Sequence, residues 1–216
     1  MKTEQKLKFL LFGATRNTGY HFMQQALDAG HQVTAIIRNP GSFDFKHLNL
    51  KVVKGDALQI QTFENEVTGK DAVVSSLGVT NLKEPTTLLS VGVANMMEAM
   101  RKTGVKRIVC VSAMALDTNP KTGLFLTLAS KVVQWVLKEP YKDTRVMEAE
   151  LKASSLNWTI VRPPQLKNKP VTGKYRLAIG DHLAAPFSIS RADVAHCILQ
   201  HIIDPSTYQK TIEIAY

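Results

Sequence analysis

The sequence has few cysteines and no long apolar run. Its 216 residues include two cysteines, Cys110 and Cys197, and Cys110 lies in an apolar stretch that predicts an inert core thiol. Because two cysteines do not make a disulfide framework, we expect a reducing compartment and a cytoplasmic protein. No stretch of 18 apolar residues occurs, which excludes a membrane-spanning helix, and the apolar run near the N-terminus is too short for a signal peptide.

Metal and nucleic-acid functions also lack support. His196 and His201 lie near the C-terminus, but no Cys or Glu stands at metal-ligand spacing beside them, so no metal is predicted. The net charge of +9 would suit nucleic acid, yet the basic residues are spread along the chain and no aromatic residues are interleaved with them for base stacking. We interpret the charge as a solvated basic surface that favours anionic ligands.

The remaining composition is that of an ordinary globular protein. Hydrophobic residues make up 44% of the chain and charged residues 21%, which are usual values. A chain of 216 residues is long enough to bury one core, so we expect a single domain over residues 1–216.

The chain is organised around the stretch LKFLLFGATRNTG, which spans Leu7 to Gly19. A short apolar run ends at Gly13, which favours a strand buried on both faces. Apolar residues then recur at helical spacing until Gly30, which is typical of a residue that closes a helix. The order is therefore strand, glycine-rich turn and helix, which is the context in which a glycine fingerprint indicates dinucleotide binding.

The turn has the chemistry of a phosphate site. Gly13 allows a sharp reversal, and Gly19 allows the helix to approach the sheet closely. The free N–H groups and the dipole at the helix start attract a pyrophosphate. Arg16 stands where a strict G-x-x-G-x-x-G motif has its middle glycine. Taken alone, the pattern would also fit an ordinary strand-to-helix turn.

Arg38 follows a second predicted strand, Val33 to Ile37. In NAD-binding units an acidic residue about 20 residues beyond the glycines bonds the ribose 2′-hydroxyl, whereas an arginine there suits a 2′-phosphate. The interval here is 38 − 13 = 25, and no carboxylate occurs before Asp44. A surface arginine would give the same pattern, but the glycine turn upstream favours the phosphate role.

Strands and helices alternate through the rest of the chain. Strands are predicted at 51–54, 72–76, 107–112, 158–161 and 211–215, and helices at 60–67, 85–102, 143–153 and from Ser190, with Asp193 as a capping residue. This pattern indicates βαβ units, and hence a single doubly wound (Rossmann) α/β domain with a mainly parallel sheet and a small C-terminal portion on the substrate side.

Right-handed crossovers place the carboxyl ends of such strands on one edge, where ligands of open α/β sheets bind. The residues that follow these strand ends are Gly13, Arg38, Asp56, Gly78 and Ser112. Five suitable residues at five strand ends make a binding site at this edge the best interpretation.

At this point the sequence resembles a known family. The motifs FGATRNTG, IIRNP, VVKGDA, SSLG, VCVSAM, WTIVRPP and ISRADVA occur in the order found in atypical short-chain dehydrogenase/reductases. The chain is most similar to the biliverdin-IXβ reductase/flavin reductase type and its bacterial NAD(P)H-binding relatives, and the likeness covers essentially the whole chain. It implies an NADP(H) cofactor and hydride transfer to a small conjugated acceptor, such as a flavin, a quinone or a tetrapyrrole.

The resemblance also implies roles for individual residues at the strand ends. The implied cofactor contacts are Gly13, Thr15, Arg16, Asn17, Thr18 and Gly19 at the phosphates, Arg38 at the 2′-phosphate, Asp56 and Ala57 near adenine, and Leu77 and Gly78 near the nicotinamide ribose. The implied nicotinamide and substrate pocket contains Ser112 as its catalytic residue, with Pro163, Pro164 and Gln165.

The sequence departs from the family pattern in places. The Tyr-x-x-x-Lys pair of typical members is absent, and its nearest equivalent is Tyr141 with Arg145. Gln165 stands where the flavin-reductase type has a histidine, and Ser42 lies in a stretch where that type has a second basic residue. The substrate therefore stays open, and so does a second class of function, an NADP(H)-binding redox sensor that regulates a partner without turnover.

Two features of the second half have competing interpretations. Residues 117–140 have no counterpart in a minimal nucleotide-binding unit and contain a very apolar predicted helix. A packing helix, a substrate lid, an oligomer face and a membrane-surface contact are all compatible with it, and we favour a lid or packing helix. Arg162 follows a strand and is either part of the site or a buried ion-pair partner.

Overall fold

The computed structural model describes residues 6–79, 81, 84–116, 121 and 124–216. Within these ranges, eight strands form one sheet in the order β3-β2-β1-β4-β5-β6-β10-β8. All neighbours pair in parallel except β8, which is antiparallel to β10. The strands of this sheet are β1 (Lys8–Phe12), β2 (Gln32–Ile37), β3 (Leu50–Lys54), β4 (Ala72–Ser75), β5 (Arg107–Val111), β6 (Asn157–Arg162), β8 (Arg176–Ile179) and β10 (Lys210–Ala215).

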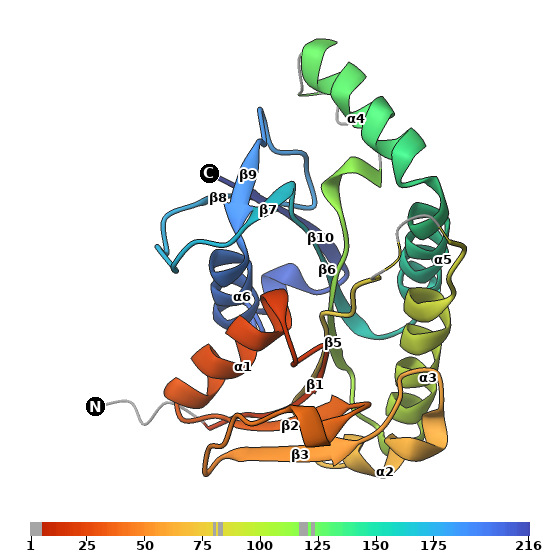
Figure 1. The fold of residues 1–216 in the computed structure, drawn as a ribbon, viewed down its shortest axis with the longest axis vertical. Coiled ribbons are helices and arrows are strands. Elements are labelled where there is room, and N and C mark those ends of the chain that lie inside the picture. Colours follow the sequence, from red (N-terminus) through yellow and green to blue (C-terminus); the bar gives the residue numbers. More distant parts are fainter. Residues whose placement is uncertain (1–5, 80, 82–83, 117–120, 122–123) are drawn as a thin grey trace.

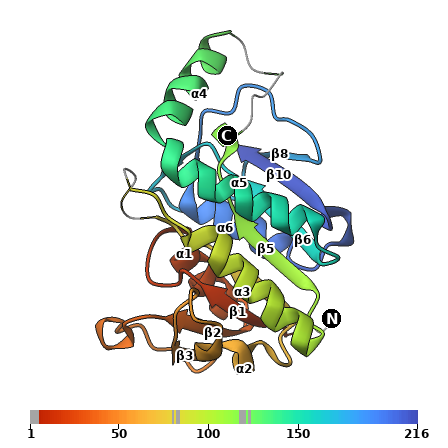
Figure 2. The same cartoon turned by 90° about the vertical axis from the view of Figure 1, so that its right-hand side faces the viewer.

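Helices cover both faces of the sheet, as the alternating pattern predicts (Figure 1). The α-helices are α1 (Asn17–Asp28), α2 (Glu64–Val67), α3 (Leu88–Thr103), α4 (Leu124–Val136), α5 (Lys138–Ala153) and α6 (Arg191–Gln200). Short 3₁₀-helices are η1 (Pro40–Ser42), η2 (Ile60–Thr62), η3 (Met114–Leu116) and η4 (Pro205–Thr207). Helices α1 and α6 lie on one face, and α2, α3 and α5 lie on the other (Figures 1 and 2). The doubly wound Rossmann-like α/β fold is confirmed.

The first strand shows why the sheet is central. Its four apolar residues are buried, and they alternate between two core clusters. Phe9 and Leu11 pack with the α1 and α6 side, and Leu10 and Phe12 pack with the α3 and α5 side. A continuous apolar run is therefore needed here, because both faces of a parallel strand are covered by helices.

Helix α3 begins later than the sequence predicts. Pro85 was expected in its first turn, but the helix begins at Leu88. The carboxylate of Asp143 on α5 accepts hydrogen bonds from the backbone N–H groups of Leu89, at 2.8 Å, and Ser90, at 3.0 Å. A side chain more than fifty residues away thus caps the helix start, and local sequence cannot reveal such a cap.

The C-terminal portion contains strands that the sequence did not predict. Strands β7 (Gln165–Lys167) and β9 (Ser188–Ser190) form a separate parallel pair, and β8 extends the main sheet. The predicted cap of α6 is confirmed, since Ser190 Oγ accepts the N–H of Asp193. The Asp193 carboxylate also accepts the N–H groups of Thr172 and Gly173, which fastens the loop before β8.

Part of segment 117–140 lies outside the described residues, namely 117–120, 122 and 123. The rest contains α4 and the start of α5, which begins at Lys138 rather than at Asp143 as predicted. Helix α4 projects from the body of the molecule, in light green at the top of Figures 1 and 2. No helix in the described part of the chain is both long and apolar enough to cross a membrane.

Candidate functional site

A cavity of about 550 Å³ lies where the carboxyl ends of β1, β2, β3 and β4 meet. Its walls come from the turn after β1, the end of β2, the loops after β3 and β4, and the start of α3. The lining residues are Phe12, Gly13, Ala14, Thr15, Arg16, Asn17, Ile36, Ile37, Arg38, Asn39, Ser42, Gly55, Asp56, Ala57, Ser76, Leu77, Gly78, Val79 and Leu88. Most of the predicted cofactor residues are therefore brought together at one place.

The glycine turn is packed too tightly for any other residue. Gly13 has φ +86°, in the left-handed region, and a Cβ there would overlap the backbone carbonyl of Ser76. A Cβ at Gly19 would overlap the carbonyl of Gly13. Both glycines are thus required by close backbone approach, and the turn is pressed against the end of β4.

Arg16 fits the turn without strain. It precedes the first turn of α1 with φ −164° and ψ 170°, an extended backbone that any residue adopts. The left-handed conformation falls on the next residue, Asn17, at φ 59°, and asparagine tolerates this region better than most residues. The loss of the middle glycine therefore costs little, and it adds a guanidinium at a helix N-terminus, where an anion already binds well.

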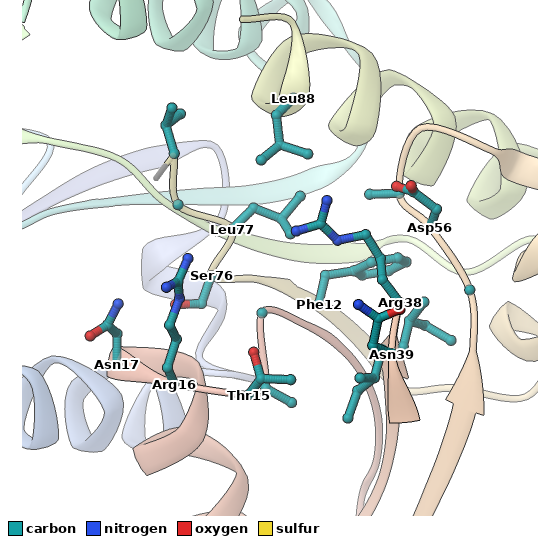
Figure 3. Close-up of a pocket in the computed structure, with 18 of the residues that line it drawn as sticks. Phe12, Thr15, Arg16, Asn17, Arg38, Asn39, Asp56, Ser76, Leu77 and Leu88 are labelled. Carbon is teal, nitrogen blue, oxygen red and sulfur yellow. The ribbon is translucent and has the colours of Figure 1, made fainter. Parts of the chain in front are cut away.

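Arg38 provides a second positive charge in the same cavity. It lies immediately after β2 and is exposed, and its side chain extends between Leu77 and Asp56 in the view of Figure 3. Among the residues that the structure describes, neither Arg38 nor Arg16 has an ion-pair or hydrogen-bond partner on its guanidinium. Both cations are free to bind an anionic ligand.

The loop after β3 is held rigidly. The N–H of Asp56 donates to Thr62 Oγ1 at 2.9 Å, and a carboxylate oxygen of Asp56 accepts the N–H of Leu58 at 3.0 Å. The side-chain amide of Asn95 on α3 donates to the carbonyl of Ala57 at 2.9 Å. These bonds hold Asp56 and Ala57 at the cavity wall in one arrangement.

Several predicted residues lie outside the cavity lining. They are Thr18, Gly19, Ser112, Pro163, Pro164 and Gln165. Thr18 and Gly19 are buried within α1, beneath the turn. Ser112 follows β5, while Pro163 and Pro164 stand between β6 and β7 and Gln165 opens β7. The N–H of Ser112 donates to the carbonyl of Val161, and the N–H of Met114 donates to that of Pro163, so these two strand ends lie side by side.

The hydroxyl of Ser112 is engaged by a buried carboxylate. It donates to Glu148 Oε1 at 2.6 Å. The same carboxylate accepts Nε of Arg162 at 2.9 Å, a second bond from the Arg162 guanidinium, and a bond from Lys152 Nζ at 3.0 Å. Arg162 is thus the buried ion-pair partner that the sequence left as one of two interpretations.

Two opposing effects act on the pKa of Glu148. Burial of the side chain, which is 3% exposed, would raise the pKa. The hydrogen bonds and charge of Arg162 outweigh burial, and Ser112 and Lys152 add to them, so the pKa lies below the ordinary value for glutamate. Glu148 therefore stays a carboxylate near neutral pH and keeps the Ser112 hydroxyl as a donor toward it.

Sequence reasoning missed several lining residues. Asn39 and Ser42 line the cavity beside Arg38, and Ser42 Oγ donates to the carbonyl of Asn39 at 3.0 Å. Ser76 and Leu88 were also missed. Ser76 could have been found, because it is the last residue of the predicted strand 72–76 and directly follows β4 in the structure. Leu88 could not, because it reaches the cavity only through the packing of α3.

The cavity contains few groups that could transfer a proton. Its only titratable side chains among the described residues are those of Arg16, Arg38 and Asp56. A rigid glycine turn, a helix start and two unpartnered cations fit a ligand with several phosphates, such as a dinucleotide. The cavity fits a dinucleotide in volume and in charge, and this fit identifies no residue as a general acid or base.

Comparison with known proteins agrees with this geometry. Residues 13–205 match the model of a family described as NAD(P)H-binding. An uncharacterised chloroplastic protein of Arabidopsis thaliana is 32% identical over 96% of this chain and 76% of its own length. The reductase pytE of Aspergillus terreus is 24% identical over 93% of each chain.

Solved structures share the fold at lower identity. A short-chain dehydrogenase/reductase of Veillonella parvula has a TM-score of 0.79 at 18% identity, covering 98% of this chain and 94% of its own. The anaerobillin reductase ChuY of Escherichia coli O157:H7 has a TM-score of 0.75 at 20% identity, covering 96% of each chain. The family match spans the glycine turn, the cavity and the C-terminal helix, so this chain belongs to the family described as NAD(P)H-binding.

Proposed function

We propose that this protein is an NADPH-dependent reductase that transfers a hydride to a small conjugated acceptor, such as a flavin, a quinone or a tetrapyrrole. One observation carries the proposal: the cavity of an NAD(P)H-binding fold has two cations without partners among the described residues and almost no titratable groups. The cations suit a phosphate-rich cofactor, and a cavity whose described titratable groups besides these cations are limited to Asp56 suits an acceptor that needs no dedicated acid.

The preference for NADPH over NADH rests on the end of β2. Arg38 stands where an arginine suits a 2′-phosphate and a carboxylate would suit a free ribose hydroxyl. Asn39 and Ser42 line the same part of the cavity and add polar side chains. These groups replace the second basic residue of the flavin-reductase type, so a 2′-phosphate would be held by one charge and neutral donors.

The acceptor class follows from the proton balance. When bound, NADPH supplies the hydride. A simple ketone would also need a positioned acid for its developing alkoxide. At the proposed acceptor edge the Ser112 hydroxyl is engaged by Glu148, and the described residues that line the cavity include no tyrosine, lysine, histidine or cysteine. A conjugated acceptor spreads the added charge over its π system and takes its proton from water. Two related proteins are named reductases, pytE by sequence and ChuY by fold, which supports the reaction class.

The carboxyl ends of β5 and β6 are the proposed place for the acceptor. Ser112, Pro163, Pro164 and Gln165 occupy this edge, next to the described cavity in strand order. The Ser112 hydroxyl donates to Glu148, so in our proposal Ser112 offers its lone pairs and shapes the pocket rather than giving up a proton.

The engaged Ser112 also favours a second candidate, an NADP(H)-binding redox sensor without turnover. Because the hydrogen bond to Glu148 withholds the Ser112 proton, a bound cofactor would transfer no hydride in this candidate.

Two further expectations stay proposals: one domain over residues 1–216, and a cytoplasmic location. The Arabidopsis relative carries the word chloroplastic in its name.

Steady-state oxidation of NADPH distinguishes the candidates. We expect flavins or quinones to be reduced faster than simple ketones, with NADPH preferred over NADH. We expect Ser112→Ala to lower turnover by less than the roughly 10²-fold that marks the loss of a general acid. Faster turnover of ketones, or a collapse of flavin reduction in the variant, would contradict the reductase proposed. Tight NADPH binding with no turnover of any acceptor would favour the sensor.

A further inference from the structure

Helix α4 carries an apolar stripe that faces away from the protein. Leu128, Val132, Trp135 and Val136 are spaced so that they share one helix face. Their exposed fractions are 54%, 61%, 79% and 57%. A helix that packs on its own domain turns such a stripe inward, so this exposure needs a different explanation.

The opposite side of α4 is the side attached to the protein. Gln134 lies about half a turn away from the stripe, and its side-chain amide donates to the carbonyl of Ala115 at 2.8 Å. The side of α4 that carries Gln134 is thus turned inward and the apolar stripe is turned outward. Figures 1 and 2 show α4 projecting beyond the rest of the ribbon, and the side chains of the stripe are exposed, which leaves the stripe available to a partner.

The one charged residue within α4, Lys131, is positive. Helix α4 contains no aspartate or glutamate. Lys131 lies at the edge of the stripe and Lys138 follows the helix, and in the described part of the chain neither has an ion-pair partner. The next carboxylate, Glu139, is paired with Lys142 at 2.9 Å. The chain as a whole carries a net charge of +9, which would attract an anionic surface from a distance.

We propose that α4 binds the surface of an anionic lipid bilayer, with its apolar stripe in the interface and its lysines at the headgroups. An exposed tryptophan on an amphipathic helix with flanking lysines has the composition of interfacial membrane helices. The helix has 13 residues and is therefore about 20 Å long, too short for a hydrocarbon core of about 30 Å. It lies in the interface and does not span the membrane.

A second copy of this chain fits the stripe less well. A symmetric dimer would bring the same face of both helices together. Two positively charged helices would then lie against each other, and α4 offers no carboxylate to neutralise Lys131. An anionic bilayer would bury the apolar stripe and would also pair the lysines with negatively charged headgroups.

Vesicle binding tests the proposal. The protein is sedimented with vesicles of phosphatidylcholine alone or of phosphatidylcholine mixed with phosphatidylglycerol, at low and at high salt. We expect binding to the anionic vesicles at low salt, weaker binding at high salt, and little binding to neutral vesicles. The fluorescence difference between wild type and Trp135→Phe isolates Trp135, and its emission should shift to shorter wavelength on binding.

Variants identify the surface. Trp135→Ser should weaken binding by about tenfold, because it removes a large apolar group that becomes buried in the bilayer interface on binding. Lys131→Glu should also weaken binding to anionic vesicles by about tenfold. Leu48→Ser is the matched control, since Leu48 is 97% exposed and lies two residues before β3, a strand at the opposite end of the molecule from α4 (Figure 1). It should leave binding unchanged. Circular dichroism and NADPH binding report whether each variant is folded.

Three outcomes would overturn the proposal. The first is no binding to anionic vesicles at low salt, and the second is an equal effect of Trp135→Ser and Leu48→Ser. The third is self-association that Trp135→Ser abolishes in the absence of vesicle binding, which would assign the stripe to a second copy. Among the described residues, none of α4 lines the cofactor cavity, so failure here leaves the proposed reductase function untouched, and the reverse also holds.

Discussion

The arginines at the cavity and the arginines buried in the C-terminal half differ in whether their guanidinium groups have partners. Arg16 and Arg38 lie at the cavity, exposed and without a partner among the described residues. Arg107 and Arg162 are 4% and 5% exposed, and both are fully engaged. Arg107 donates to the carbonyl of Ile202 at 2.6 Å and to that of Asn157 at 2.7 Å, and Arg162 binds Glu148.

The difference separates a binding role from a structural role. A buried guanidinium needs its hydrogen bonds for the fold to be stable, because an unpaired charge in the interior is costly. Burial lowers the pKa of Arg107 to about 10, but the group stays charged near neutral pH. An exposed guanidinium without a partner contributes little to stability and is available for a ligand. The two classes should therefore respond oppositely to substitution.

The largest expected effect is at the buried pair. Arg162→Met leaves the Glu148 carboxylate buried without its main partner and should lower the free energy of unfolding by about 3–5 kcal/mol. The double variant Glu148→Met/Arg162→Met should recover most of that loss, because no unpaired charge remains. Urea unfolding of the three proteins measures both values. A double variant as unstable as the single one would show that the pair acts through packing and not through charge.

The glycine turn comes next. Gly13→Ala places a methyl group against the carbonyl of Ser76 and adds strain at a positive φ, so we expect a stability loss of more than about 1 kcal/mol and weaker binding of NADPH and NADH alike. Gly69→Ala is the matched control, because Gly69 also has a positive φ, +71°, but open space around it. Calorimetry of cofactor binding should show a loss only at Gly13. Equal losses at both sites would rule out the steric explanation.

Arg38 should behave oppositely to Arg162. Arg38→Ala removes a charge-assisted contact and should weaken NADPH binding by about 1.5–3 kcal/mol, with NADH binding and the free energy of unfolding nearly unchanged. Arg101→Ala serves as the control, since Arg101 is exposed, pairs only with Glu98 and lies on α3. Fluorescence titration of wild type and the two variants with each cofactor gives the six affinities. Equal wild-type affinities for NADPH and NADH would end the 2′-phosphate assignment.

The smallest expected effect is a pH dependence of the free energy of unfolding that comes from Glu148. Glu148 has a lowered pKa in the folded protein, so its contribution to stability is fully present above the unfolded value of about 4.3 and is lost as pH falls through the folded pKa. Wild type should be more stable than Glu148→Gln at neutral pH, and the gap should narrow in acid. Urea midpoints over this pH range check the trend, and a constant gap would contradict it.

The sequence predicted the nucleotide half of the fold well. Its strands are apolar runs that end in glycine, arginine or aspartate, and its helices have regular apolar spacing, so both signals are local. Arg16 and Arg38 could be assigned to the cavity because parallel strands bring their carboxyl ends to one edge. The C-terminal half was predicted less well, since β7 and β9 have three residues each and offer no periodicity.

The sequence by itself determined the alternation of strands and helices, the two glycines of the turn and the positive charge after β2. These depend on backbone conformation and side-chain spacing, which neighbouring residues set. Tertiary structure alone decided which charges have partners: Asp143 caps α3, Glu148 engages Ser112 and Arg162, and Trp135 faces outward. The cap of α3 by Asp143 and the ion pair of Glu148 with Arg162 form between segments that only packing brings together, and so their energies have no local signature in the sequence.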